Sequence, residues 1–306
     1  MQEFFFENLA TKIYCTAWEY VTDPVGVVVL VHDMGDYSKR FGDFADYLNA
    51  NGYLVLAPDL RAHGRTAGGF DRRGEAEGDC FFDSVSDLHQ LICYALSTYR
   101  LPLVMVGVGY GALLTLAYVQ QHKDTVLGAA LLSPNALNGT QTLIGNIVNS
   151  TIIGFVDNRS PATIYNRYMY KRYEKPFLQD KLRFAWISRD KNEVRRYVND
   201  AYCGAQFAFS LGFAQSLCRG MMKLSQTKRM RAIPADLPIL LAAGDADPVC
   251  EYGLGTQKLR SILQKSGKNK CVMRLYTKAR HDLLHEINRD EVHCDLLDFI
   301  NRCMGK

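Results

Sequence analysis

Short apolar runs separated by polar or glycine-containing loops recur along most of the chain. Several runs consist of Val, Leu, Ile and Ala almost throughout, and such runs predict β-strands that are buried on both faces. Segments with apolar residues at helical spacing follow several of the runs, and this alternation predicts a mostly parallel sheet covered by helices. The predicted buried strands are residues 25–31, 53–57, 103–108, 126–132 and 238–243.

The two ends of the chain have a different pattern. Residues 3–7 and 12–20 predict two paired strands, and the second alternates apolar and polar positions as a half-exposed antiparallel strand does. Residues 271–276 predict the last strand. The predicted helices are residues 40–51, 82–99, 112–121, 252–265 and 290–303. Together these segments predict an α/β fold with helices on both faces of the sheet.

Strand-like runs are missing between residues 134 and 234. This stretch has irregular helical patterns rich in Tyr, Arg and Phe, and the alternation of strands and helices resumes after it. The pattern predicts an α/β core of residues 1–133 and 235–306 with an inserted helical cap, or lid, of residues 134–234. Ligands of such sheets bind outside the carboxyl ends of the strands, so we expect the site where the loops after the central strands converge.

Residues 103–122 have the pattern of a strand, a sharp turn and a helix. The turn is G-V-G-Y-G, with Gly107, Gly109 and Gly111. This is the context in which the sequence G-x-S-x-G forms a nucleophile elbow, a turn that exposes a serine side chain at the carboxyl end of the sheet. Gly109 stands at the serine position, so the sequence predicts an elbow without a hydroxyl nucleophile.

Other structures fit this stretch less well. A phosphate-binding turn has the pattern G-x-G-x-x-G, and G-x-G-x-G lacks the last glycine. A transmembrane helix over residues 101–119 would be only just long enough to span a bilayer, and it would contain Pro102 and internal glycines. The elbow remains the favoured interpretation.

Two later strand ends carry residues capable of acid–base chemistry. Asp247 follows the predicted strand 238–243, and His281 follows the predicted strand 271–276. The chain order elbow, Asp, His is that of an α/β-hydrolase, in which the imidazole takes the nucleophile's proton and a buried carboxylate fixes its tautomer. Asp247 and His281 are therefore predicted to form a catalytic pair beside Gly109.

Several segments, spread in order over nearly the whole chain, match one family. They are VHDMGDYSKRF (31–41), APDLRAHGRT (57–66), the elbow, WISRDKNEVRRYV (186–198), AAGDADPV (242–249) and ARHDLLHEINRDEV (279–292). With these segments the chain resembles the monoacylglycerol lipase/lysophospholipase branch of the α/β-hydrolases, a group often labelled serine-aminopeptidase-like. The resemblance implies the α/β-hydrolase fold, and it implies that Asp247 and His281 are the triad acid and base.

The resemblance also implies where a ligand would bind. By that likeness the backbone N–H groups of Met34 and Tyr110 form the oxyanion hole, and His32, Asp33 and Val108 belong to the pocket. The implied ligand is a small molecule with an acyl or other mostly apolar chain. The resemblance implies no metal and no cofactor.

The matching segments depart from the family pattern around the active site. The family elbow is usually G-H-S-x-G-G, whereas residues 107–112 are G-V-G-Y-G-A. His32-Asp33 replaces an H-G pair, and residues 61–64, R-A-H-G, replace R-G-H-G. A similar first loop and elbow occur in the N-myc downstream-regulated proteins, which resemble α/β-hydrolases but lack the triad. Several neighbouring departures indicate natural divergence and not one engineered change.

Position 109 decides the predicted function. Removing a serine nucleophile costs roughly a million-fold in turnover, so we expect a lysophospholipase-like pseudoenzyme whose serine-ester hydrolysis is lost or severely impaired. Glycine also relaxes the strained elbow backbone, and Gly109→Ser is expected to lower stability slightly. One alternative is an active carboxylic-ester hydrolase, with serine at 109 in the natural protein or with water activated by Asp247 and His281. Another is a non-catalytic interaction module that uses the cap as a docking surface.

Composition narrows the setting of the protein. The chain has 306 residues and a net charge of +4, which is too small to indicate nucleic-acid binding. Its nine cysteines form no C-x-x-C pair, and the start has no secretory pattern, so we expect reduced thiols in a cytoplasmic protein. A peripheral membrane contact through the cap is a further expectation. The oligomeric state does not follow from the sequence.

Overall fold

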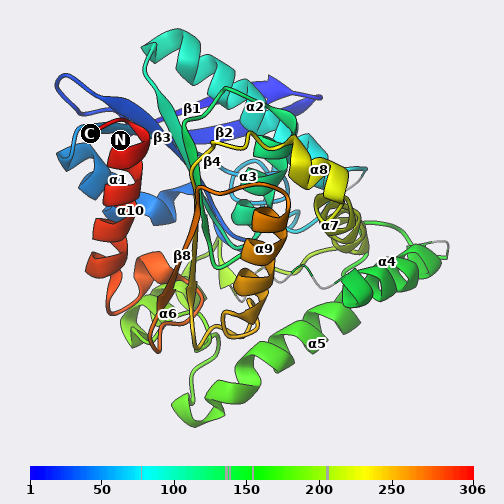
Figure 1. Cartoon of the computed structure of the whole chain (residues 1–306). Helices are drawn as coiled ribbons and strands as arrows, with labels where there is room; N and C mark the ends of the chain where they lie inside the picture. The colour runs from blue at the N-terminus through cyan, green and yellow to red at the C-terminus, as the bar shows by residue number, and fades with distance from the viewer. Residues whose placement is uncertain (77, 135–136, 138, 154, 205–206) are drawn as a thin grey trace.

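An eight-stranded sheet forms the centre of the molecule (Figure 1). The computed structural model describes residues 1–76, 78–134, 137, 139–153, 155–204 and 207–306. The strand order is β1-β2-β4-β3-β5-β6-β7-β8. The strands are β1 (Gln2–Asn8), β2 (Thr11–Trp18), β3 (Gly26–Val31), β4 (Tyr53–Pro58), β5 (Leu103–Val108), β6 (Gly128–Leu132), β7 (Ile239–Gly244) and β8 (Cys271–Tyr276).

The strand pairing confirms the predicted, mostly parallel sheet. The β1–β2 and β2–β4 pairs are antiparallel, whereas the neighbouring pairs from β4 to β8 are parallel. Val31 at the end of β3 pairs with Gly107 of β5, and Gly107 pairs with Leu131 of β6. The carboxyl ends of three central strands therefore meet at one edge of the sheet, where parallel sheets bind their ligands.

Helices cover both faces of this sheet. They include α1 (Gly42–Ala50), α2 (Cys80–Tyr99), α3 (Tyr110–Gln121), α9 (Leu254–Lys265) and α10 (Arg289–Cys303). Because side chains alternate along a strand, Val27 and Val29 of β3 pack in the core that contains α2 and α3, and Val28 and Leu30 pack in the core that contains α1 and α10. The central strands are apolar throughout for this reason.

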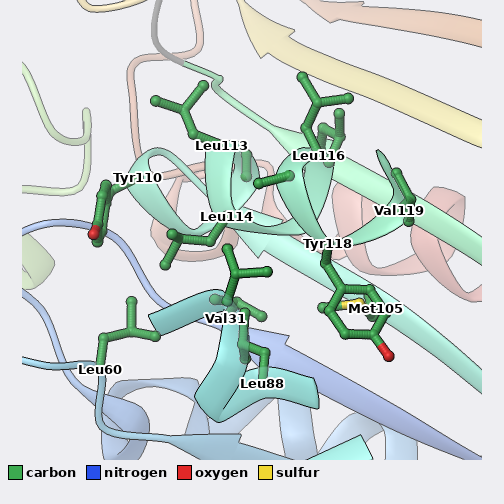
Figure 2. Close-up of a cluster of buried hydrophobic side chains, with 14 of the residues drawn as sticks. Val31, Leu60, Leu88, Met105, Tyr110, Leu113, Leu114, Leu116, Tyr118 and Val119 are labelled. Carbon is green, nitrogen blue, oxygen red and sulfur yellow. The ribbon is translucent and has the colours of Figure 1, made fainter. Parts of the chain in front are cut away.

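Helix α3, which follows the glycine-rich turn, is buried from Tyr110 to Gln120. Figure 2 shows Leu114 of α3 in one apolar cluster with Val31 of β3 and Met105 of β5. Residues 101–119 thus contain a strand and a separate buried helix, and the alternative of a membrane-spanning helix is wrong. No helix in the described ranges combines the length and the hydropathy that a bilayer crossing requires.

The chain between β6 and β7 is largely helical. It contains α4 (Gly139–Ile153), α5 (Thr163–Glu174), a 3-10 helix (Lys175–Asp180), α6 (Lys191–Asn199), α7 (Leu211–Leu224) and α8 (Thr227–Ala232). Helix α4 packs on α7, which also contacts α2, and Figure 1 shows α4 and α5 away from α1 and α10. Residues 135–136, 138, 154 and 205–206 of the predicted cap lie outside the described residues, and the division into core and cap stays a prediction.

Candidate active site

The glycine-rich turn joins β5 directly to α3. Gly109 has φ 51° and ψ −111°, a conformation that side-chain-bearing residues rarely adopt. Gly111 packs so closely on the end of β3 that a Cβ at this position would lie less than 3.0 Å from the carbonyl oxygen of Val31. The turn therefore has the sharp geometry of an elbow, and its middle residue faces the end of the sheet without a side chain.

The carboxylate of Asp33 occupies the space in front of Gly109. A Cβ built on Gly109 would lie less than 3.0 Å from Cγ, Oδ1 and Oδ2 of Asp33. The backbone N–H of Tyr110, at the N-terminus of α3, donates to Asp33 Oδ1 at 2.6 Å. A helix N-terminus favours an anion because its first N–H groups have no partner in the helix. Asp33 thus fills the place where the serine side chain would begin.

Asp33 and Asp247 hold the two ring nitrogens of His281. Nδ1 of His281 lies 2.8 Å from Asp247 Oδ2, and Nε2 lies 2.9 Å from Asp33 Oδ2. Asp247 is fully buried, and its Oδ1 accepts a hydrogen bond from the backbone N–H of Val249 at 2.8 Å. The structure brings together the elbow, Asp247 and His281, as the sequence predicts, with Asp33 as a further member. We call these three side chains the Asp33–His281–Asp247 cluster.

The charge of His281 follows from its two neighbours. Burial by itself would lower the pKa of the imidazole, but the carboxylates of Asp247 and Asp33 outweigh burial and raise the pKa of His281 well above its ordinary value. The two carboxylates thus favour the imidazolium form of the ring, in which each nitrogen donates a hydrogen bond. An imidazolium has no free lone pair with which to accept a proton.

The raised pKa of His281 predicts a pH-dependent stability. A pKa that is higher in the folded than in the unfolded chain gives a contribution that is fully present below about pH 6.5 and is lost as the pH rises through the folded value. We expect the free energy of unfolding to fall more steeply with rising pH in the wild type than in Asp33→Asn, as measured by urea titrations at several pH values. Asp43→Asn, which changes an exposed carboxylate on α1, should follow the wild type. Parallel curves for wild type and Asp33→Asn would contradict this interpretation.

His32 supports the loop that carries Asp33 and is fully buried. Its Nδ1 donates to the backbone carbonyl of Asp33 at 2.7 Å, and its Nε2 accepts from the backbone N–H of Leu60 at 2.9 Å. The ring thus ties the loop after β3 to the loop after β4. The structure gives His32 a supporting position, which differs from the pocket position that the resemblance implies.

Glu286 belongs to the framework around the site, and the sequence did not indicate this role. This fully buried carboxylate accepts from the backbone N–H groups of Arg189 and Arg280 at 3.0 and 2.8 Å, and it pairs with the Arg189 guanidinium at 2.8 Å. It joins the loop of His281 to the segment before α6. A lone glutamate after a histidine-rich stretch carries no sequence signal that separates this role from that of an exposed helix residue.

A cavity of about 720 Å³ lies among α4, α5 and α7 and extends to Met34. Its lining is mainly apolar, with Arg172, Glu251 and a few hydroxyl groups as its polar members. Among the described residues, Met34 belongs to the lining, whereas His32, Asp33 and Val108 do not. The lining includes Met34, which follows Asp33 in the sequence, and Pro248, which follows Asp247.

The chain also contains groups that could bind a metal, but their placement does not indicate a site. Within the described ranges no cluster of three or more His, Cys, Asp or Glu side chains could hold a metal ion. All nine cysteines are free thiols, and burial raises the pKa of Cys250 beside Asp247 above its ordinary value. A substitute thiolate nucleophile is therefore not supplied by this residue.

Lipases and an esterase are among the known proteins that this chain is similar to. A curated relative, "Monoglyceride lipase homolog" of Monkeypox virus, is 24% identical over 92% of this chain and 89% of the relative. "Monoacylglycerol lipase" of Mycolicibacterium smegmatis is 23% identical over 94% of this chain and 92% of the relative. The crystal structure of a thermostable carboxyl esterase from Bacillus coagulans superposes with a TM-score of 0.90 at 24% identity, covering 99% of this chain and 98% of the esterase.

The superposition establishes the α/β-hydrolase fold. The family model described as "Serine aminopeptidase, S33" matches residues 22–288. This range includes Asp33, the elbow, Asp247 and His281, and it extends over most of the 306 residues. The chain therefore belongs to the serine aminopeptidase S33 family of α/β-hydrolases.

Proposed function

We propose that this protein binds a single-chain acyl lipid of the monoacylglycerol or lysophospholipid class and does not hydrolyse it by serine-ester chemistry. The observation that carries the proposal is the partner of His281 Nε2. In a serine hydrolase this nitrogen takes the proton of the nucleophilic hydroxyl. Here it lies 2.9 Å from the Asp33 carboxylate, and Gly109 has no hydroxyl to offer.

The loss of activity follows from the chemistry of the remaining groups. An acyl-enzyme requires an activated oxygen or sulfur nucleophile, and the elbow supplies none. Loss of such a nucleophile lowers turnover by roughly a million-fold. The proposal therefore predicts no measurable acyl transfer on the time scale of an ordinary assay.

The alternative of a water-activating hydrolase requires two conditions at His281. The imidazole must have a free lone pair, and a water must lie beside Nε2. Asp33 Oδ2 occupies the hydrogen-bonding position of Nε2, and the two carboxylates favour the imidazolium form of the ring. This arrangement supports the binding protein over a weak general-base hydrolase.

The cavity supports an acyl ligand. Its volume of about 720 Å³ falls within the range of roughly 300–1,000 Å³ that small-molecule sites have. Apolar side chains from α4, α5 and α7 form most of its wall, as a hydrocarbon chain requires. The names of the curated relatives, monoglyceride and monoacylglycerol lipases, favour a glycerol ester as the ligand.

Filling the cavity should weaken lipid binding. Met221 on α7 lines the cavity, whereas the neighbouring Met222 is half-buried and does not belong to the described lining. We expect Met221→Trp to raise the Kd for a non-hydrolysable monoacylglycerol ether at least about tenfold, which corresponds to 1.4 kcal/mol, and Met222→Trp to leave it near the wild-type value. Fluorescence or calorimetric titration measures both.

The same preparation tests the loss of hydrolysis. Wild-type protein is incubated with 1-monoolein, and the release of oleate is followed by mass spectrometry. We expect binding without release above the rate in buffer. Release of oleate by the wild type would contradict the proposed loss of hydrolysis. Absence of monoolein binding would favour the non-catalytic interaction module over the lipid-binding protein.

A further inference from the structure

The carboxylate of Asp33 stands where two separate parts of a serine-hydrolase site would act. We propose that Asp33 is a built-in anion that fills both the nucleophile position and the oxyanion hole, so that ester chemistry is blocked independently of Gly109. The proposal rests on the proposed function in one respect, the absence of serine-ester hydrolysis. It adds that activity returns only when the Asp33 side chain is removed and a serine is introduced at position 109 together.

The first block is steric. A Cβ at position 109 would lie less than 3.0 Å from three heavy atoms of the Asp33 carboxyl group, a separation that real Cβ atoms essentially never show. The carboxylate cannot keep its hydrogen bonds and also leave room for a side chain there. Asp33 in this position and any residue larger than glycine at position 109 therefore exclude each other.

The second block is electrostatic. An oxyanion hole stabilises a developing negative charge with donors about 2.7–3.1 Å from the oxyanion. Asp33 Oδ1 already takes the N–H of Tyr110 at 2.6 Å, and the side chain of Asp33 is only 18% exposed. An ester carbonyl entering this place would have to displace a carboxylate. If it entered alongside, its developing charge would meet a charge of the same sign.

The third consequence concerns the base. Asp33 Oδ2 is 2.9 Å from His281 Nε2 and stabilises the proton on that nitrogen. The nearest charged partners of the ring are Asp33 on one side and Asp247, at 2.8 Å, on the other. Removing the Asp33 carboxylate leaves the usual pair of one imidazole and one carboxylate, in which Nε2 can accept a proton.

The restored reaction would follow ordinary acyl transfer. The hydroxyl introduced by Gly109→Ser attacks the ester carbonyl, and its proton moves to His281 Nε2. The carbonyl oxygen becomes negative and accepts the N–H of Tyr110. The alcohol leaves with the proton from Nε2, and water then hydrolyses the acyl-enzyme by the same route, giving the acid and the free hydroxyl.

Four proteins test the proposal: wild type, Asp33→Gly, Gly109→Ser and the double variant. Glycine is chosen at position 33 because the family that the chain resembles has an H-G pair where this chain has His32-Asp33. Turnover of p-nitrophenyl butyrate and covalent labelling by a fluorophosphonate are measured after thermal melts have confirmed folding. We expect the double variant to exceed each single variant at least about 100-fold in turnover and to be the variant that is labelled. Equal activity of Gly109→Ser and the double variant would overturn the block by Asp33, as would a folded double variant that shows neither turnover nor labelling.

A second measurement does not depend on the double variant. In Asp33→Gly alone, the place of the carboxylate is empty, so added acetate should bind there and restore the pKa of the His281 ring toward its wild-type value. Nitrogen-15 NMR of the imidazole measures this pKa, and acetamide, which has a similar shape without charge, should have no effect. An unchanged ring pKa in Asp33→Gly, or no response to acetate, would overturn the proposal. Lipid binding and monoolein release by the wild type are separate readouts, so failure of the proposed function is recognised independently.

Discussion

Replacing Gly109 with alanine should lower the free energy of unfolding by about 3–5 kcal/mol, more than the slight loss that the sequence predicts for Gly109→Ser, because the carboxylate of Asp33 occupies the space of the new side chain. Part of this cost is the backbone strain of a side-chain-bearing residue at φ 51°, which is of order 1–3 kcal/mol. The rest is the loss of the charge-assisted hydrogen bonds that the Asp33 carboxylate accepts from the backbone N–H of Tyr110 and from His281 Nε2, which are worth roughly 1.5–3 kcal/mol. Urea unfolding of the wild type and the variant measures the difference.

Two controls separate strain from displacement of the carboxylate. Gly267 also has a positive φ, of 86°, but a Cβ there would meet nothing within 4 Å, so Gly267→Ala should cost only about 1–2 kcal/mol. When Asp33→Gly is already present, Gly109→Ala should lower the free energy of unfolding only by the backbone strain, because no carboxylate has to be displaced. If the cost at position 109 were the same with and without Asp33, the two residues would not compete for space.

Changing Glu286 to glutamine should destabilise the protein by about 3–5 kcal/mol, the cost of breaking a buried ion pair by removing one charge. The carboxylate of Glu286 is fully buried and accepts from three backbone N–H groups and from the Arg189 guanidinium. An amide in its place would direct N–H against N–H and leave the guanidinium of Arg189 without its carboxylate. Urea unfolding again supplies the measurement.

Glu3→Gln is the matched control for Glu286→Gln. Glu3 pairs with Lys39 and Arg65, but its side chain is 32% exposed, so the loss of its charge should cost no more than about 1 kcal/mol. Similar costs at the two positions would show that burial and the backbone donors around Glu286 do not decide its contribution.

Much of the fold could be predicted because its central strands are apolar on both faces. The strands Leu103–Val108 and Cys271–Tyr276 agree with the prediction in both bounds, and the other strands agree within a few residues. Helix boundaries were less exact. Helix α3 begins at Tyr110, two residues before the predicted start, because Tyr110 and Gly111 carry no helical signal of their own and enter the helix through packing against the sheet.

The meeting of three parts of the site could be predicted from the sequence, whereas the roles of two buried carboxylates could not. The chain order of the elbow, Asp247 and His281 follows from the succession of strand ends, so their meeting was expected. The role of Asp33 as the partner of His281 Nε2 was not expected. Its position in front of Gly109 depends on how the loop after β3 turns back over the elbow, and no spacing in the sequence encodes this turn. Glu286 was missed for a similar reason, since its partners Arg189 and Arg280 lie far from each other in the sequence.

The mutual exclusion of a side chain at position 109 and the Asp33 carboxylate has a consequence for the history of such a protein. If Asp33 blocks the site as proposed, a lineage with this pair would need two codon changes to gain ester hydrolysis, and each change alone would bring no activity for selection to favour. The intermediate with Gly109→Ser alone would also be less stable than its parent. Such a transition is therefore easier to make than to reverse, and descendants are expected to keep diverging toward tasks that need no turnover.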